Sequence, residues 1–206
     1  KIIKSFLFYG CCLLQQISIP STVKKIEKSA FYDCISLTEI SIPPSVKSVG
    51  SYLFYQCSSL TNVSILAPLT KLPEALFYKC SSLQQVIIPQ SVNEIGDDVF
   101  KKCSSLIEIT IPSNVTTIGK HSFFECSSLK NITILGPLKT LPKALFCKCS
   151  SLQRITIPST VNEIEDFAFS DCTSLTEISI PSNVTKIGKK AFLRCSSLQQ
   201  ITIPSS

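Results

Sequence analysis

Cysteine is the residue of this 206-residue chain whose type and spacing could do the most chemistry. Nine of the eleven cysteines recur every 23 residues, from Cys11 onward, without insertion or deletion. Thiols repeated in this way could ligate a metal, pair as disulfides, act as nucleophiles or fill a hydrophobic core. The recurring positions, called the cysteine ladder below, are Cys11, Cys34, Cys57, Cys80, Cys103, Cys126, Cys149, Cys172 and Cys195.

A metal site and a catalytic thiol are both disfavoured by the spacing. Zinc sites use ligand pairs a few residues apart, whereas only Cys11-Cys12 and Cys147-x-Cys149 are close, and His121 is the sole histidine. His121 shares a repeat with Cys126, but nothing marks the two as a dyad, and a lone histidine is most simply an exposed turn residue. No Ser-His-Asp or paired-carboxylate constellation stands out either. The sequence therefore predicts no cofactor, no metal and no enzyme.

Disulfides are harder to exclude than metals. If successive repeats stack as neighbouring strands, they lie ~4.8 Å apart, which is within the range that a disulfide tolerates. However, side chains in register point in parallel rather than toward one another, and nine cysteines cannot pair completely. We therefore interpret the cysteine ladder as buried free thiols.

The residues around each cysteine repeat with the same period. Phenylalanine stands three positions before it and leucine three after it, followed by alternating aliphatic residues, a proline in seven of nine repeats and a further aliphatic pair. A 23-residue unit cannot bury its own apolar face, but stacked units can. The pattern predicts an α/β-type repeat solenoid with a parallel sheet of short strands on one face. Helical or 3₁₀ turns are expected on the other faces, for example at Lys28-Ser29-Ala30.

A longer period, three repeats in length, is superimposed on the first. The third and sixth repeats replace the proline at the strand end by Leu66-Ala67 and Leu135-Gly136, which predicts a local change in the outer turn and in curvature. Duplication of a three-repeat block explains this similarity. We expect one solenoid domain over residues 1–206 with about nine repeats. Since the chain has no methionine and both ends fall inside repeats, we expect it to be a fragment.

These residues resemble a known family, the BspA-like leucine-rich repeats. The segment 180–195, IPSNVTKIGKKAFLRC, closely follows the unit I-P-x-x-V-x-x-I-G-x-x-A-F-x-x-C of that family. The resemblance implies a leucine-rich-repeat solenoid of the surface-antigen type found in anaerobic bacteria and parasitic protists. It further implies adhesion to host or neighbouring-cell protein and a location at the cell surface or in secretions. It supplies no catalytic residues.

Two exposed columns are candidate ligand-binding surfaces. On each strand the residue two after the leucine faces away from the core, in a polar, nearly neutral column beside a Ser/Thr ladder that strand propensity alone could explain. A second column carries four of the five tyrosines, which either contact a partner or pack between repeats. The sheet-face column comprises Gln16, Glu39, Asn62, Gln85, Glu108, Asn131, Arg154 and Glu177, and the tyrosine column comprises Tyr9, Tyr32, Tyr55 and Tyr78.

Four asparagines match the N-glycosylation pattern, although the repeat itself generates this pattern. Sugars at the two that lie on strands would obstruct the sheet face. The four are Asn62, Asn114, Asn131 and Asn183.

The composition narrows the function classes that remain. Apolar residues make up 44% of the chain and charged residues 17%, which is typical of a folded protein. The net charge of +6 is spread over scattered lysines, so we expect no nucleic-acid partner. A wide polar strip suits a protein, or a glycan, better than a small-molecule substrate. The alternatives to adhesion are an intracellular, cytoplasmic scaffold, which free thiols would suit, and a rod that associates end to end.

Overall fold

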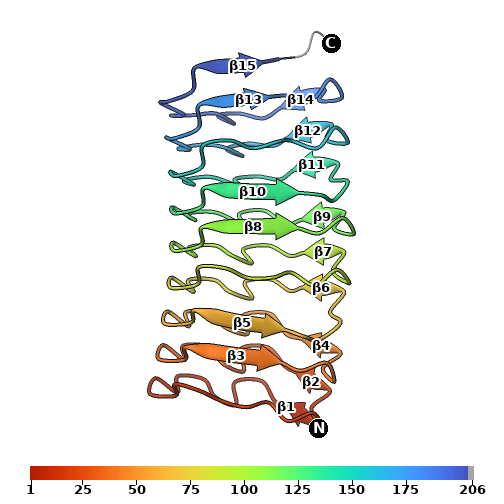
Figure 1. Cartoon of the computed structure of the whole chain (residues 1–206), viewed down its shortest axis with the longest axis vertical. Coiled ribbons are helices and arrows are strands. Elements are labelled where there is room, and N and C mark those ends of the chain that lie inside the picture. The colour runs from red at the N-terminus through yellow and green to blue at the C-terminus, as the bar shows by residue number, and fades with distance from the viewer. Residues whose placement is uncertain (204–206) are drawn as a thin grey trace.

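The computed structural model describes residues 1–203 as a stack of coils running from the N-terminus at the base of Figure 1 to residue 203 near its top. The end of the predicted domain, residues 204–206, lies outside the described residues. Each coil contributes one segment to a front column of longer strands. These strands are β3 (Glu39–Ile42), β5 (Asn62–Ile65), β8 (Glu108–Ile111), β10 (Asn131–Ile134), β13 (Glu177–Ser179) and β15 (Gln200–Thr202).

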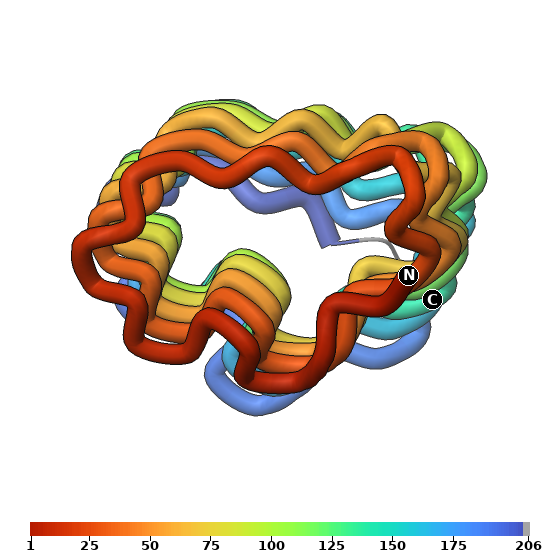
Figure 2. The backbone as a smooth tube through the Cα atoms, turned by 90° about the horizontal axis from the view of Figure 1, so that it is seen from below, coloured from red at the N-terminus to blue at the C-terminus, as the bar shows by residue number. Residues whose placement is uncertain are grey.

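A second column of two-residue strands follows the turn after the front strand. Seen end-on in Figure 2, the successive coils superimpose on a closed outline, which is how equivalent residues of successive repeats come to lie side by side. The strands of this column are β1 (Ile2–Ile3), β2 (Lys25–Ile26), β4 (Ser48–Val49), β6 (Lys71–Leu72), β7 (Glu94–Ile95), β9 (Thr117–Ile118), β11 (Thr140–Leu141), β12 (Glu163–Ile164) and β14 (Lys186–Ile187).

All strand pairs are parallel and in register from one repeat to the next. In β3 the alternation buries Ile40 and Ile42 and exposes Glu39 and Ser41, and β5 pairs with it residue for residue. This is the period-2 pattern of a strand with one face on the core. The predicted parallel sheet of a repeat solenoid is confirmed.

The sheets are interrupted with the three-repeat period. The front column pairs as β3–β5, β8–β10 and β13–β15, while segments 85–88 and 154–157 form no strand. In the first two blocks the substitution of proline supplies a reason, because the N–H groups of Leu66 and Leu135 donate to the carbonyls of Ile42 and Ile111, each at 3.0 Å. The third block keeps proline at this position, and β13 and β15 pair without that bond. Proline has no N–H to make this bond. The altered repeats therefore tie the third coil of a block to the second.

The core is a single cluster that runs from Ile3 to Ala191. The phenylalanines stack along it, with ring centroids 5.3 to 5.7 Å apart from Phe31 to Phe192, and those from Phe31 to Phe169 are fully buried. Each ring covers the faces of its neighbours, so burial is shared between coils. A coil therefore depends on its neighbours for most of its buried area.

The expectation of helical turns is wrong. The segment with Lys28-Ser29-Ala30 is a non-helical turn, because Ser29 and Asp33 both adopt left-handed backbone conformations, with φ of 55° and 59°. A left-handed residue ends any right-handed helix. Between these two positions the backbone bonds to the next coil instead, as where the Phe31 N–H donates to the carbonyl of Leu53 at 3.1 Å. Within residues 1–203 no helix could cross a membrane.

Candidate functional site

The cysteine ladder is part of the core. Its members from Cys34 to Cys172 are fully buried, and all eleven cysteines are free thiols. Each buried thiol donates to the carbonyl of the phenylalanine one coil earlier, for example Cys103 Sγ to Phe77 O at 3.1 Å. That carbonyl also accepts the N–H of Cys80 at 3.0 Å. The interpretation as buried free thiols is confirmed for Cys34 to Cys172, but Cys11 in the first coil is exposed and Cys195 in the last is only partly buried, because each lacks one neighbouring coil. The thiol–carbonyl bond is a feature that the repeat pattern did not reveal.

Burial makes the ladder thiols poor nucleophiles. Desolvation, the largest cause, raises the pKa of the Cys103 and Cys126 thiols well above their ordinary range. A nucleophilic or metal-bound cysteine needs a lowered pKa and an electropositive, accessible setting. Of the eleven cysteines, only Cys11, in the ladder, and Cys12, outside it, are exposed. Among residues 1–203 no group of three or more potential ligands could hold a metal ion.

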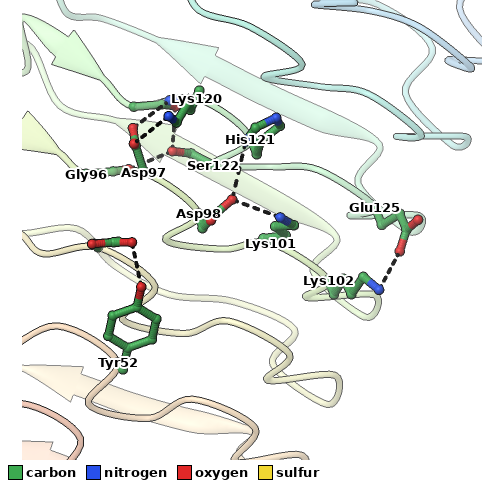
Figure 3. A network of polar contacts seen from close by, with 12 residues as sticks. Tyr52, Gly96, Asp97, Asp98, Lys101, Lys102, Lys120, His121, Ser122 and Glu125 are labelled. Carbon is green, nitrogen blue, oxygen red and sulfur yellow. Dashed lines mark hydrogen bonds and ion pairs between the residues drawn. The ribbon is translucent and has the colours of Figure 1, made fainter.

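The sole histidine lies in a polar network, shown in Figure 3. His121 Nδ1 is 3.5 Å from Asp98 Oδ1, which is itself 3.2 Å from the ammonium of Lys101. Desolvation, only partly opposed by Asp98, lowers the pKa of His121. His121 is half-buried rather than an exposed turn residue as expected, because the neighbouring coil packs Asp98 against its ring.

A serine, a histidine and an aspartate therefore meet at this point, but they do not form a catalytic triad. The hydroxyl of Ser122 is fully buried and lies 2.8 Å and 2.7 Å from the carbonyls of Gly96 and Gly119. A nucleophilic serine must instead donate to the histidine and be reached by substrate. The trio is a structural contact between coils. Cys126 is not paired with His121 either, since its thiol donates to Phe100.

The sheet-face column is continuous and exposed. All eight predicted residues, from Gln16 to Glu177, are exposed and follow one another at the step of one repeat. Neighbours within a block interact across coils: Gln85 Nε2 donates to Glu108 Oε1 at 3.1 Å, and Arg154 Nε is 3.3 Å from Glu177 Oε1. These exposed contacts are weak, so the groups can exchange them for contacts with a partner.

Three shallow hollows lie along the sheet face, one in each three-repeat block. Each begins at the first strand segment of the block and extends over the next two. The lining of each includes one acidic residue of the column: Glu39 in the first, Glu108 in the second and Glu177 in the third. In the second hollow Ile87, which is 85% exposed, occupies a position where the other hollows have Ser18 and Thr156.

The four predicted tyrosines do form one column. Tyr9, Tyr32, Tyr55 and Tyr78 stack with ring centroids 5.0, 4.4 and 4.6 Å apart. Because each ring covers its neighbour's face, the column presents ring edges and hydroxyls to solvent. Desolvation is also the largest cause that raises the pKa of Tyr55 to about 12. This geometry is that of packing between coils and leaves little ring face for a planar ligand.

The four sequons fall into two structural pairs. Asn62 and Asn131 begin strands β5 and β10 and are exposed on the sheet face. Asn114 and Asn183 lie at the turn after the front strand, where each Nδ2 donates to a carbonyl of the preceding coil at 2.7 Å. Glycosylation at all four positions stays a prediction.

The family model described as "BspA type Leucine rich repeat region" matches residues 1–128 and 95–206. A leucine-rich repeat protein of T. pallidum is similar, with 31% identity, a TM-score of 0.73 and coverage of 77% of each chain. A leucine-rich repeat protein from Bacteroides ovatus ATCC 8483 has 27% identity and a TM-score of 0.71, covering 92% of this chain and 63% of that one.

A third structure is a leucine-rich cell surface protein from Faecalibacterium prausnitzii A2-165. It has 28% identity and a TM-score of 0.58, and the match covers 100% of this chain and 70% of that one. Among curated proteins no sequence matches this chain.

Proposed function

Because the chain belongs to the BspA-type leucine-rich-repeat family, we propose that it is a non-catalytic module that binds protein at the cell surface through its sheet face. The observation that carries this proposal is the sheet-face column, an exposed polar strip that follows the stacked coils. Repeat solenoids bind partners through such extended surfaces. The similarity to a cell surface protein supports the location, and the absence of a triad around His121 fits recognition without chemistry.

The hollows suggest how a partner is held. Three acidic residues of the column recur at the three-repeat step, one to a hollow, and Ile87 adds an exposed apolar side chain in the second hollow. Interfaces commonly combine a central apolar anchor with a polar rim that fixes register. We therefore place the centre of the interface at Ile87 and Glu108, with Glu39 and Glu177 toward the two ends.

One observation favours the alternative of an intracellular scaffold. All eleven cysteines are free, which suits a reducing compartment. The fold weakens this argument, since the ladder thiols are shielded from oxidants by burial. Exposed thiols at Cys11 and Cys12 are the two whose oxidation state would report the compartment.

Reversing charge on the sheet face is expected to reduce adhesion. Beads that carry the protein should bind cultured epithelial cells, and Glu39→Lys, Glu108→Lys and Glu177→Lys together should lower binding on the order of tenfold, because interfacial charge complementarity is lost. The control variant is Glu74→Lys, Glu94→Lys and Glu163→Lys, which makes the same charge change away from the sheet face. Equal binding by the two variants, or binding that survives trypsin treatment of the cells, would contradict the proposal.

A further inference from the structure

A column of lysines lies along the edge of the first three coils, on the turn that precedes β2 and β4. The N–H of Lys24 donates to the carbonyl of Lys1, and the N–H of Lys47 donates to the carbonyl of Lys24, both at 2.8 Å. All three side chains are exposed. Coil stacking therefore places three ammonium groups in register, at steps of ~4.8 Å along the backbone. We call Lys1, Lys24 and Lys47 the lysine column.

The lysine column has no compensating carboxylate. Across residues 1–203, no acidic oxygen lies within 4.0 Å of the ammonium of Lys1, Lys24 or Lys47. The carboxylate of this edge, Glu27, contacts Lys4 and Lys25 at 3.9 and 3.8 Å instead. Like charges directly opposite on neighbouring strands are destabilising. The column therefore costs stability in the free protein, a cost that a bound anion would relieve.

The fold does not require lysine at these positions. One three-repeat block later, the same turn positions carry Thr70, Asn93 and Thr116, and they stack with the same bonds, such as the Asn93 N–H to the Thr70 carbonyl at 2.9 Å. The two blocks share their pattern of core positions and differ here by three charges. In the third block the same positions carry Lys139, Asn162 and Thr185, so three stacked lysines occur only in the first block and are not a requirement of the repeat.

We infer that the lysine column is a binding site for a linear sulfated polysaccharide. Lysine ammonium groups act as compact point charges on flexible stems, which suits sulfate groups spaced along a chain. Exposed Lys28 extends the positive edge toward the next turn. Nucleic acid fits less well, because single strands are held by stacking successive bases on several exposed aromatic faces. The stacked tyrosines cover one another's faces, and within residues 1–203 the ring beside Lys28 is that of Phe6 alone. This site is separate from the sheet face.

The test uses immobilised heparin as the sulfated probe, with single-stranded DNA and phosphatidylserine vesicles as the other polyanions. The protein should bind heparin with an affinity that falls as salt rises, through release of counterions. Replacing the column by its block-two counterparts, Lys1→Thr, Lys24→Asn and Lys47→Thr, should weaken binding on the order of 100-fold, since each lysine near an anionic surface contributes roughly fivefold.

Two matched variants keep the test specific to the column. Lys130→Asn, Lys143→Asn and Lys189→Asn remove the same charge from exposed lysines at other positions of the coil and should change heparin binding far less. Thr70→Lys, Asn93→Lys and Thr116→Lys, made in the otherwise unchanged protein, add a second lysine column in the second block and should strengthen heparin binding. The inference is overturned by equal losses in the two removal variants, by no heparin binding at low salt, or by tighter binding of DNA or vesicles than of heparin.

Discussion

Raising the pH from 8 to 10 is expected to unfold this protein cooperatively, well below the pH at which a thiol-free domain would respond. Seven thiols of the cysteine ladder, Cys34 to Cys172, are fully buried. Burial raises the pKa of each, for example that of Cys80, above the ordinary value of 9.0. The unfolded chain can therefore release seven protons that the folded chain retains.

The direction of the effect follows from linkage. A group with a raised pKa in the folded state contributes its full stability below the unfolded pKa and loses it as pH rises above that value. At one pH unit above 9.0 each buried thiol loses about 1.4 kcal/mol, so seven lose about 10 kcal/mol. A domain has about 5–15 kcal/mol in total. The tyrosines add to this only at higher pH, since the ordinary value is 10.0 even for Tyr55.

Urea unfolding at a series of pH values measures this slope directly. The free energy of unfolding should be nearly flat from pH 7 to 8 and then fall with a slope that approaches seven protons. Cys103→Ala supplies the control, because it removes one linked proton and should reduce the limiting slope by about 1.4 kcal/mol per pH unit. A flat profile to pH 10 would mean that the ladder thiols ionise as readily in the folded chain as in the unfolded one.

Removing one ring from the middle of the phenylalanine stack should lower the free energy of unfolding by a large part of the total that a domain has. Phe100 is fully buried, with ring centroids 5.6 Å from Phe77 and 5.3 Å from Phe123. Phe100→Ala is expected to lower the free energy of unfolding by about 3–5 kcal/mol, because it leaves a cavity. It also breaks two aromatic contacts, each contributing about 0.5–1.5 kcal/mol.

The end of the stack provides a matched comparison. Phe8 is only partly buried and stacks on one neighbour, Phe31, at 5.1 Å. Phe8→Ala should therefore cost less than half as much as Phe100→Ala, as judged by the midpoint of urea unfolding at pH 7. Equal costs for the two variants would show that the rings do not act as a shared stack.

The repeat pattern was sufficient to predict the stacked coils, the parallel sheet and the residues that fill the core. It was not sufficient for the turns, because the left-handed positions hold residues such as Ser29, Asp33 and Lys102 rather than glycine. Only Gly10 among them carries the usual signal. Backbone hydrogen bonds between successive coils, such as that from the Phe31 N–H to the Leu53 carbonyl, hold the backbone of these turns in a conformation that the residue types do not predict.

Two of the three candidate surfaces could be predicted from the sequence, and the third could not. The sheet-face and tyrosine columns were visible because their residues recur within the repeat. The lysine column is not apparent from the sequence, because Lys1, Lys24 and Lys47 look scattered when charges are counted along the chain. Their spacing of one repeat is the signal that identifies them, since it means that they share one position of the coil. In a repeat protein, charge patterns are informative only when they are compared at the repeat period.

The most direct test of the whole account is a count of reactive thiols in the folded and unfolded protein. With Ellman's reagent at neutral pH the folded protein should react rapidly at two cysteines, the exposed Cys11 and Cys12, and all eleven should react in guanidinium. Rapid reaction of most ladder cysteines in the folded state would contradict a core built from them. Fewer than eleven thiols after unfolding would show that some are paired or modified rather than free.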